Sequence, residues 1–390
     1  MNRRSALIGI GAGLLAGWGL VALFSPRGRA PEPPLVEDVG RIARVVIHYA
    51  PGADAGEVVA EIYRRFLAAV GPEVRVVWVV EDAHALDDLQ ARLGDAYPPD
   101  SVALTTGHAI TTWSKDRFTC LARVGGRGPT TLLAPARKAV PNPLRTNDQE
   151  VPWRLAAAFP RLFACRDMRM DFDGGDILAT SRGVFVHPAI LSKNDPAAPP
   201  FQPQGPEPVE GSAESLRERL RSQLGEFIWL GPAEPDVPPH HVGMFLTVAN
   251  GTAFVGDVRL ADRLTAGHEG ELEAACRSAG GPADAATRAE LARQLDCVAA
   301  QMRRLGLRVV RVPLMPSAAA RAWMSYNNGI VDTRGGRTIY YMPTFGMSRL
   351  DDAAGRIFRG AGCDVVPIDC SRIWHLCGSL HCLVNVVARD

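Results

Sequence analysis

Short β-branched runs alternate with segments of helical periodicity along this chain, and that alternation limits the folds open to it. The run "RIARVVIHYA" (residues 41–50) is followed by a helical pattern at 54–70 and by the run "VRVVWVVE" (74–81). β-Branched residues favour strands, whereas apolar residues spaced three and four apart favour helices. Strands that alternate with helices are typical of α/β proteins. The sequence therefore predicts an α/β fold.

The same patterns predict further elements and one long loop. Strands are predicted at residues 101–106, 130–134, 176–180, 183–187, 227–230, 244–249, 252–255, 307–312, 337–342, 364–368 and 380–387. Helices are predicted at residues 83–93, 213–224, 285–304 and 350–360. Six prolines between residues 194 and 211 exclude a helix or a central strand, so this stretch is predicted to be an exposed loop. A loosely recurring unit of strand, helix and paired strands suits a repetitive α/β architecture as well as a doubly wound sheet.

Residues 1–35 are predicted to be a signal or anchor segment with a linker, and residues 36–390 a single domain. Arg3 and Arg4 precede nineteen uncharged residues, 6–24, which approach the length of a bilayer span. The only small-x-small cleavage candidate, residues 28–30, is followed directly by Pro31, so an uncleaved anchor is favoured over a cleaved signal. The domain is therefore expected to be exported, on the periplasmic or extracellular face.

The near-neutral charge of the chain indicates that any binding partner is recognised by local features of the surface. A formal net charge of +1 gives no global field to attract nucleic acid or anionic lipid, so membrane contact is expected only through the N-terminal segment. An exported chain with eight cysteines favours disulfides, although spacing alone leaves their pairing open. The cysteines form no C-x-x-C pair, so neither a zinc ribbon nor a redox motif is supported.

Four short segments combine polar side chains with turn signals, at the ends of predicted strands where sites are usual. They are "TTWSKDRFTC" with Trp113 and Asp116, "MDFDGGDIL" with Asp173 and Asp176, "PPHHVGMFLTV" with His240 and His241, and "GSLHCLVN" with Cys382. Taken singly, Cys382 is explained as a buried hydrophobe or half of a disulfide, and Asp116 as a turn cap. The adjacent histidines do not have the spacing of a zinc site on a helix, so no metal site is predicted.

In this order, the four segments resemble the motifs of the guanidine-modifying enzymes of the pentein superfamily, above all the catalytic domain of peptidylarginine deiminases and also agmatine deiminases. Those families carry a W-x-x-D or R-D turn, an acid-Gly-Gly turn, an H-x-D motif and a C-terminal H-C. The ending "GSLHCLVNVV" is similar to their G-x-x-H-C-x-x-N-V, with Asn385 in place. The segments "SYNNGIV", which contains Asn327, and "YYMPTFG" fall where those families have an N-rich strand and a P-x-F-G segment. The resemblance spans residues 41–390.

The resemblance implies an α/β propeller with approximate five-fold pseudosymmetry and a deiminase reaction. That reaction hydrolyses an arginine-type guanidine, free or in a peptide, to a ureide and ammonia. Cys382 would be the nucleophile that forms a thiouronium intermediate, and His241 would act as acid and base. Asp116 would bind the guanidinium, and Asp173 would orient His241 or contact the substrate. The further substrate-binding residues implied are Trp113, Asp176, Asn327 and Gly243. No cofactor is implied, and no acidic loop has the spacing of a calcium site.

Position 243 departs from the family pattern, because the deiminases carry there a second carboxylate that binds the guanidinium. Its loss removes a charge-assisted contact of about 1.5–3 kcal/mol. Dimethylargininases also lack an aspartate there, so Gly243 is compatible with a bulkier or alkylated guanidine. It is equally compatible with a guanidine- or peptide-binding protein that has lost turnover, and an amidinotransferase is a further alternative that uses the same cysteine and histidine. Asp176 and Asp236 are candidates to supply the missing charge.

Overall fold

The computed structural model describes residues 32–51, 56–123, 128–137, 143–195, 213–319 and 322–390, which belong to one compact unit, Glu32–Asp390. The predicted anchor at 6–24 and most of the predicted loop at 194–211 lie outside the described residues. Among the helices that are described, none is both long and apolar enough to cross a membrane. Helices and strands alternate along the chain, so the predicted α/β class is confirmed.

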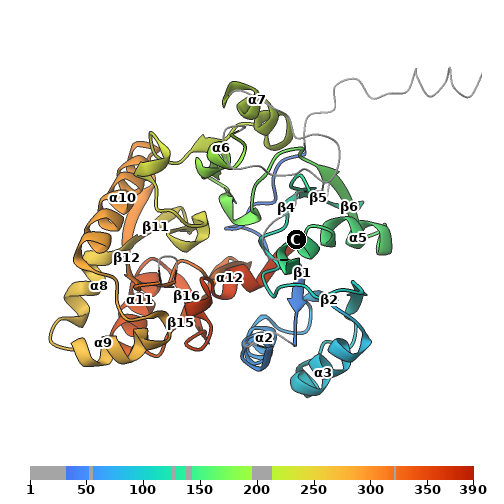
Figure 1. Cartoon of the computed structure of the whole chain (residues 1–390), viewed down its shortest axis with the longest axis horizontal. Coiled ribbons are helices and arrows are strands. Elements are labelled where there is room, and N and C mark those ends of the chain that lie inside the picture. The colour runs from blue at the N-terminus through green and yellow to red at the C-terminus, as the bar shows by residue number, and fades with distance from the viewer. Residues whose placement is uncertain (1–31, 52–55, 124–127, 138–142, 196–212, 320–321) are drawn as a thin grey trace, which may run out of the picture. The chain divides into compact units, whose positions relative to one another are not determined.

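The strands of the described residues form five small sheets (Figure 1). Their strand orders are β17-β1-β2-β3, β4-β5-β6, β7-β8-β9, β10-β11-β12-β13 and β14-β15-β16. The bounds are β1 Ile42–Tyr49, β2 Arg75–Val80, β3 Val102–Thr105, β4 Thr119–Leu121, β5 Thr130–Ala134, β6 Phe163–Asp167, β7 Ile177–Thr180, β8 Gly183–Val186, β9 Ile228–Trp229, β10 Leu246–Ala249, β11 Thr252–Asp257, β12 Arg308–Pro316, β13 Trp323–Ser325, β14 Ile330–Arg334, β15 Arg337–Thr344, β16 Cys363–Asp369 and β17 Val384–Arg389. Each sheet begins with an antiparallel pair, whose second strand lies parallel to the next strand.

Helical segments make the crossover between the parallel strands of each sheet, because parallel neighbours need a long connection. The helices are α2 Gly56–Val70, α3 Ala83–Leu93, α4 Pro143–Asp148, α5 Val151–Ala158, α6 Ala189–Lys193, α7 Ala213–Leu224, α8 Val258–Thr265, α9 Glu269–Cys276, α10 Ala285–Arg304, α11 Ser348–Gly360 and α12 Leu380–Leu383. In α2, apolar residues such as Val59, Tyr63 and Phe66 recur at helical spacing and are buried. The recurring unit is therefore an antiparallel pair, a helical crossover and a parallel strand.

Strand β17 pairs antiparallel with β1, which joins the two ends of the unit, and the C-terminus lies beside β1 (Figure 1). The prediction of one strand over residues 380–387 is wrong in its first half, because residues 380–383 form the helical turn α12. A short apolar run suits a buried helical turn as well as a strand, so periodicity could not separate the two. The turn begins after Ser379, whose backbone N–H and hydroxyl both donate to Asn328 Oδ1, at 3.0 and 2.9 Å.

Asn385 connects β17 to the loop before β4. Its side chain is fully buried, and its amide nitrogen donates to the carbonyl oxygens of Ser114 at 3.2 Å and Phe118 at 3.4 Å. We expect Asn385→Ala to lower the free energy of unfolding by about 1–3 kcal/mol, because it removes the shared donor of two carbonyls. Urea denaturation measures the change. As a control, Gln90→Ala on the exposed face of α3 should change stability by less than about 0.5 kcal/mol; an equally small effect of Asn385→Ala would contradict this expectation.

Candidate functional site

One cleft of about 630 Å³ gathers most of the predicted site residues. Its lining includes Trp113, Asp116, Asp173, Asp176, His241 and Cys382. Gly243 and Asn327 lie elsewhere and border a smaller cavity of about 30 Å³. The amide of Asn327 is buried and donates to the carbonyl oxygen of Phe254 at 2.9 Å. The structure therefore corrects the predicted placement of Asn327 and Gly243, which are not walls of the cleft.

The site residues converge because they occupy equivalent places in the recurring sheets. In four of the five sheets, they lie a few positions before the strand that opens the antiparallel pair. Asp116 precedes β4, Asp173 precedes β7, His241 precedes β10 and Cys382 precedes β17. In the remaining sheet, the segment before β14 contains Asn327. A repeated unit thus delivers chemically different side chains to one cleft.

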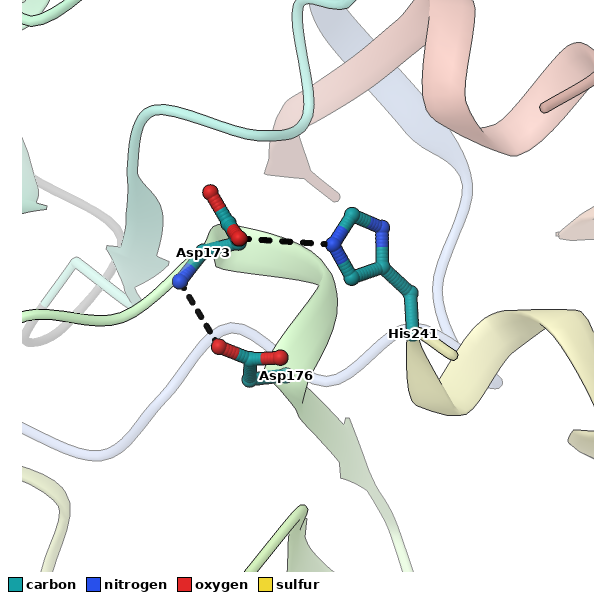
Figure 2. Close-up of side chains that lie close together, drawn as sticks. All are labelled: Asp173, Asp176 and His241. Carbon is teal, nitrogen blue, oxygen red and sulfur yellow. Dashed lines mark hydrogen bonds and ion pairs between the residues drawn. The ribbon is translucent and has the colours of Figure 1, made fainter. Parts of the chain in front are cut away.

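The imidazole of His241 lies between two carboxylates. Its Nδ1 is 3.7 Å from Asp116 Oδ1. Its Nε2 is 3.6 Å from Asp173 Oδ2, a contact that Figure 2 shows. Cys382 lines the same cleft as this ring. Burial alone would lower the pKa of His241, but the two carboxylates and the thiol outweigh burial and raise the pKa well above its usual value of 6.5. His241 is therefore a cation at neutral pH, in the cleft that Cys382 also lines.

Several cationic side chains besides His241 lie around the Asp173 carboxylate. Its Oδ1 lies 3.0 Å from Arg117 Nη2 and 3.4 Å from Arg145 Nη2, and its Oδ2 lies 2.9 Å from Lys193 Nζ. Burial would raise the pKa of Asp173, yet Lys193, Arg117 and His241 hold it well below its usual value of 3.8. Asp173 therefore stays ionised across the pH range in which His241 loses its proton.

Asp173, Asp176 and His241 form a group, within the described residues, whose ligand atoms lie within 4.8 Å of one another (Figure 2). Such a group could hold a metal ion, but Lys193 already places its ammonium against both carboxylates. Burial would lower the pKa of Lys193, and the two carboxylates raise it above its usual value. The amine is therefore charged, and it supplies the positive charge that an ion would supply between the two acids.

A guanidinium from the protein itself lies on the carboxylate that was predicted to bind one. Arg145, on α4, donates from Nη1 to Asp116 Oδ2, and its Nη2 lies 3.4 Å from Asp173 Oδ1. Its side chain lines the cleft and is about one quarter exposed. A guanidinium and a carboxylate match in geometry and charge, so this pairing demonstrates that the acids of the cleft suit a guanidinium group.

The Gly-Gly turn is required sterically by the position of His241. Asp173 caps the short helical turn Gly174–Asp176, and its backbone N–H donates to Asp176 Oδ2 at 2.8 Å. A Cβ added at Gly175 would lie 2.5 Å from His241 Cγ, which is closer than nonbonded carbon atoms approach. The glycine therefore lets the turn pack directly against the imidazole.

Cys382 is nearly buried, at 4% exposed, and still lines the cleft. It packs in an apolar cluster against which Trp113 also lies, and its carbonyl oxygen accepts from the backbone N–H of Lys115 at 3.2 Å. All eight cysteines are in the described residues, and none of them forms a disulfide. The thiol of Cys382 is therefore available for chemistry in the cleft.

Sequence reasoning missed the cations of the site. Arg145 and Lys193 lie in segments that match no motif, and Arg117 directly follows a predicted acid. Asp236, a candidate for the missing second carboxylate, pairs instead with Arg293 at 2.7 Å and does not line the cleft. Asp176 does line it, but its carboxylate is held by Lys193. Neither acid is free to replace a carboxylate at Gly243.

Comparison with solved structures identifies enzymes of the same fold. A protein provisionally described as a peptidyl-arginine deiminase is 12% identical, with a TM-score of 0.62 over 92% of this chain and 99% of its own. A cysteine-to-serine variant of the C. jejuni agmatine deiminase with substrate bound is 13% identical, with a TM-score of 0.61 over 93% and 99%. The agmatine deiminase of Enterococcus faecalis is 15% identical, with a TM-score of 0.57 over 92% and 96%. The resemblance seen in the sequence is thus confirmed at the level of the fold.

Other comparisons find no match: neither a family model nor a curated protein matches this sequence.

The charges around His241 lead to a test that needs no substrate. We expect NMR titration to give His241 a pKa well above 6.5 in the native protein. In Asp116→Asn the attraction that raises this pKa is weaker, so the pKa of His241 should fall toward its usual value. The control Asp296→Asn removes an exposed acid that pairs with Arg259 and does not line the cleft, so it should leave the titration of His241 unchanged. A native His241 that titrates below 6.5 would show that burial outweighs the carboxylates.

Proposed function

We propose that this protein is a cysteine-dependent hydrolase that converts an arginine-type guanidine, free or in a peptide, to a ureide with release of ammonia. One observation carries the proposal. The cleft contains the thiol of Cys382 and the imidazole of His241, beside acids that hold the guanidinium of Arg145. The fold shared with agmatine and peptidyl-arginine deiminases supports chemistry on guanidine groups.

The reaction requires a strong nucleophile, because a guanidinium carbon is a poor electrophile. The Cys382 thiolate adds to that carbon and forms a tetrahedral adduct. His241, charged in the resting protein, then protonates the leaving nitrogen, so that ammonia departs and a thiouronium remains. The imidazole, now neutral, removes a proton from water, which adds to the same carbon. The thiolate then leaves, the hydroxyl group of the adduct releases its proton to solvent or to the departed ammonia, and the product is a ureide, with Cys382 and the charged His241 restored.

The acids have separate roles in this mechanism. Asp116 accepts hydrogen bonds from the substrate guanidinium in place of Arg145. Asp173, through its contact with His241 Nε2, keeps the imidazole oriented and charged. Trp113 forms an apolar wall of the cleft beside Cys382. Each role follows from a contact that already exists in the resting site.

The finer architecture and the location of the protein are also part of the proposal. We infer that the five sheets are arranged as an α/β propeller with five-fold pseudosymmetry, because all five repeat one pattern of strand pairing. The uncharged segment at residues 6–24 favours an exported protein held by an N-terminal membrane anchor.

A binding protein without turnover is the second candidate. The observation that favours it is the resident Arg145, which fills the guanidinium position on Asp116. In such a protein, a guanidine ligand would replace Arg145 and remain unchanged. An amidinotransferase would form the same intermediate but pass the amidino group to an amine.

The reaction is tested by incubating the full chain with agmatine, arginine, methylated arginines and an arginine peptide. We expect ammonia and a ureide in equal amounts with at least one of them, and about 10³-fold less with Cys382→Ser, because hydroxyl is a much weaker nucleophile. Cys297→Ser, at a cysteine on α10 away from the cleft, should keep full activity. Binding of these compounds without any product would overturn the hydrolase in favour of the binding protein. An amidino product that forms only with an added amine would indicate the transferase.

The pairing of Arg145 with Asp116 has a kinetic consequence. A substrate must displace Arg145, so Arg145→Ala should lower KM by about tenfold while kcat changes little, since a tenfold change corresponds to about 1.4 kcal/mol. Steady-state kinetics measure both constants. The control is Arg137→Ala, which removes an arginine that pairs with Glu150 and does not line the cleft. A higher KM in Arg145→Ala would show instead that Arg145 binds the substrate.

A further inference from the structure

Glu37 lies in the segment before β1 and contacts two side chains, Lys115 and His381. Its Oε1 accepts from Lys115 Nζ at 2.7 Å, and its Oε2 lies 2.5 Å from His381 Nε2. An ionised carboxylate only accepts hydrogen bonds, so Nε2 of His381 is the donor. All three side chains are largely buried, with 17%, 6% and 12% exposed for Glu37, Lys115 and His381. This contact spans 344 positions of the sequence.

The charge of Glu37 is fixed by these two partners. Burial would raise its pKa, but Lys115 and His381 together hold the pKa well below its usual value of 4.5. Its backbone is fixed as well. The N–H of Glu37 donates to the carbonyl oxygen of Ala179 at 2.8 Å, and its own carbonyl oxygen accepts from Arg389 Nη2 at 2.9 Å. The carboxylate is therefore held at a defined point, ionised.

Both partners of Glu37 are immediate neighbours of the proposed catalytic machinery. Lys115 precedes Asp116, and His381 precedes Cys382. The two segments also contact each other, because the N–H of Lys115 donates to the Cys382 carbonyl at 3.2 Å. One carboxylate thus ties together the acid that would bind guanidinium and the thiol that would attack it.

Gly243 belongs to the same arrangement. A Cβ added there would lie 3.0 Å from His381 Nδ1 and 3.2 Å from His381 Cε1. Because Glu37 holds the opposite nitrogen of this ring, the imidazole cannot easily move away from a side chain at position 243. The glycine that departs from the deiminase pattern therefore makes room for the ring that reaches Glu37.

We propose that Glu37 is a positioning residue: through Lys115 and His381 it sets the placement of Asp116 and Cys382, and Gly243 is the space this arrangement needs. The expected effect of Glu37 on turnover rests on the proposed function, whereas its expected effect on the alkylation rate of Cys382 does not.

The test compares Glu37→Gln, Glu37→Asp and native full-length protein. We expect alkylation of Cys382 by iodoacetamide to slow by about 10- to 100-fold in Glu37→Gln, the range that small misplacements produce. Fragment ions of the tryptic peptide that spans residues 373–389 separate Cys382 from Cys377. With a guanidine substrate, kcat should fall by a similar factor. KM should change by less than about threefold, because the substitution affects the chemical step more than substrate binding. Glu37→Asp keeps the charge and should recover part of both rates.

Asp38→Asn is the matched control. Asp38 is the neighbouring buried acid, and it accepts from the backbone N–H of Ser181 at 2.7 Å and from its hydroxyl at 2.6 Å. The midpoint temperature of thermal unfolding should fall in both Asp38→Asn and Glu37→Gln. Alkylation of Cys382 should slow only in Glu37→Gln. An equal decrease of the alkylation rate in the two variants would overturn the proposal, since it would show that either substitution merely destabilises the segment around residues 37 and 38. A folded Glu37→Gln with native alkylation would overturn it as well.

Gly243→Ala provides an independent variant. It should slow alkylation as Glu37→Gln does, and the double variant should be no slower than the slower single one, because both act through His381. Effects that multiply in the double variant would overturn the link between the two positions. If native protein turns over no guanidine, the proposed function fails, while the alkylation measurements still decide the role of Glu37.

Discussion

The antiparallel pairing of β17 with β1 is the interaction on which the site depends. It joins the two ends of the compact unit, so the segments just before each of these strands are brought close together. One of those segments carries Cys382 and the other carries Glu37. The buried amide of Asn385 then connects β17 to the loop of Asp116. Without this pairing, the thiol would have neither a fixed backbone nor a neighbouring acid.

Charge balance is the second constraint on the cleft. Buried carboxylates are tolerated only where cations or hydrogen-bond donors surround them. Here Arg117, Arg145 and Lys193 meet that need for Asp116, Asp173 and Asp176, and His241 completes the set. Of these cations, Arg145 is a guanidinium on an exposed edge of the cleft, so it is the partner that an incoming guanidinium could replace.

Much of the fold followed from local patterns, since helices α3, α7 and α10 lie at the residues that periodicity predicted. Short strands such as β4 and β6 were missed, because three to five residues carry too little pattern to be recognised. Asp116, Asp173, His241 and Cys382 were predicted from the motif order, and each precedes the first strand of a repeated unit, whereas the arginine and the lysine of the cleft match no motif. Asn327 shares that position but turns to the core, where its amide meets a carbonyl. Glu37 was overlooked because it lies in a proline-rich stretch that resembles a linker, and its partners Lys115 and His381 are 78 and 344 positions away.

The long separation between Glu37 and His381 has a consequence for biosynthesis. A ribosome makes β1 well before β17, so for most of translation one edge of β1 has no partner. An unpaired edge strand invites pairing with other chains, and nascent proteins are vulnerable to such contacts. The same order means that the cleft cannot assemble on a nascent chain until β17 has emerged, so the thiol of Cys382 meets the acids of the cleft only after the strands of all five described sheets have been made.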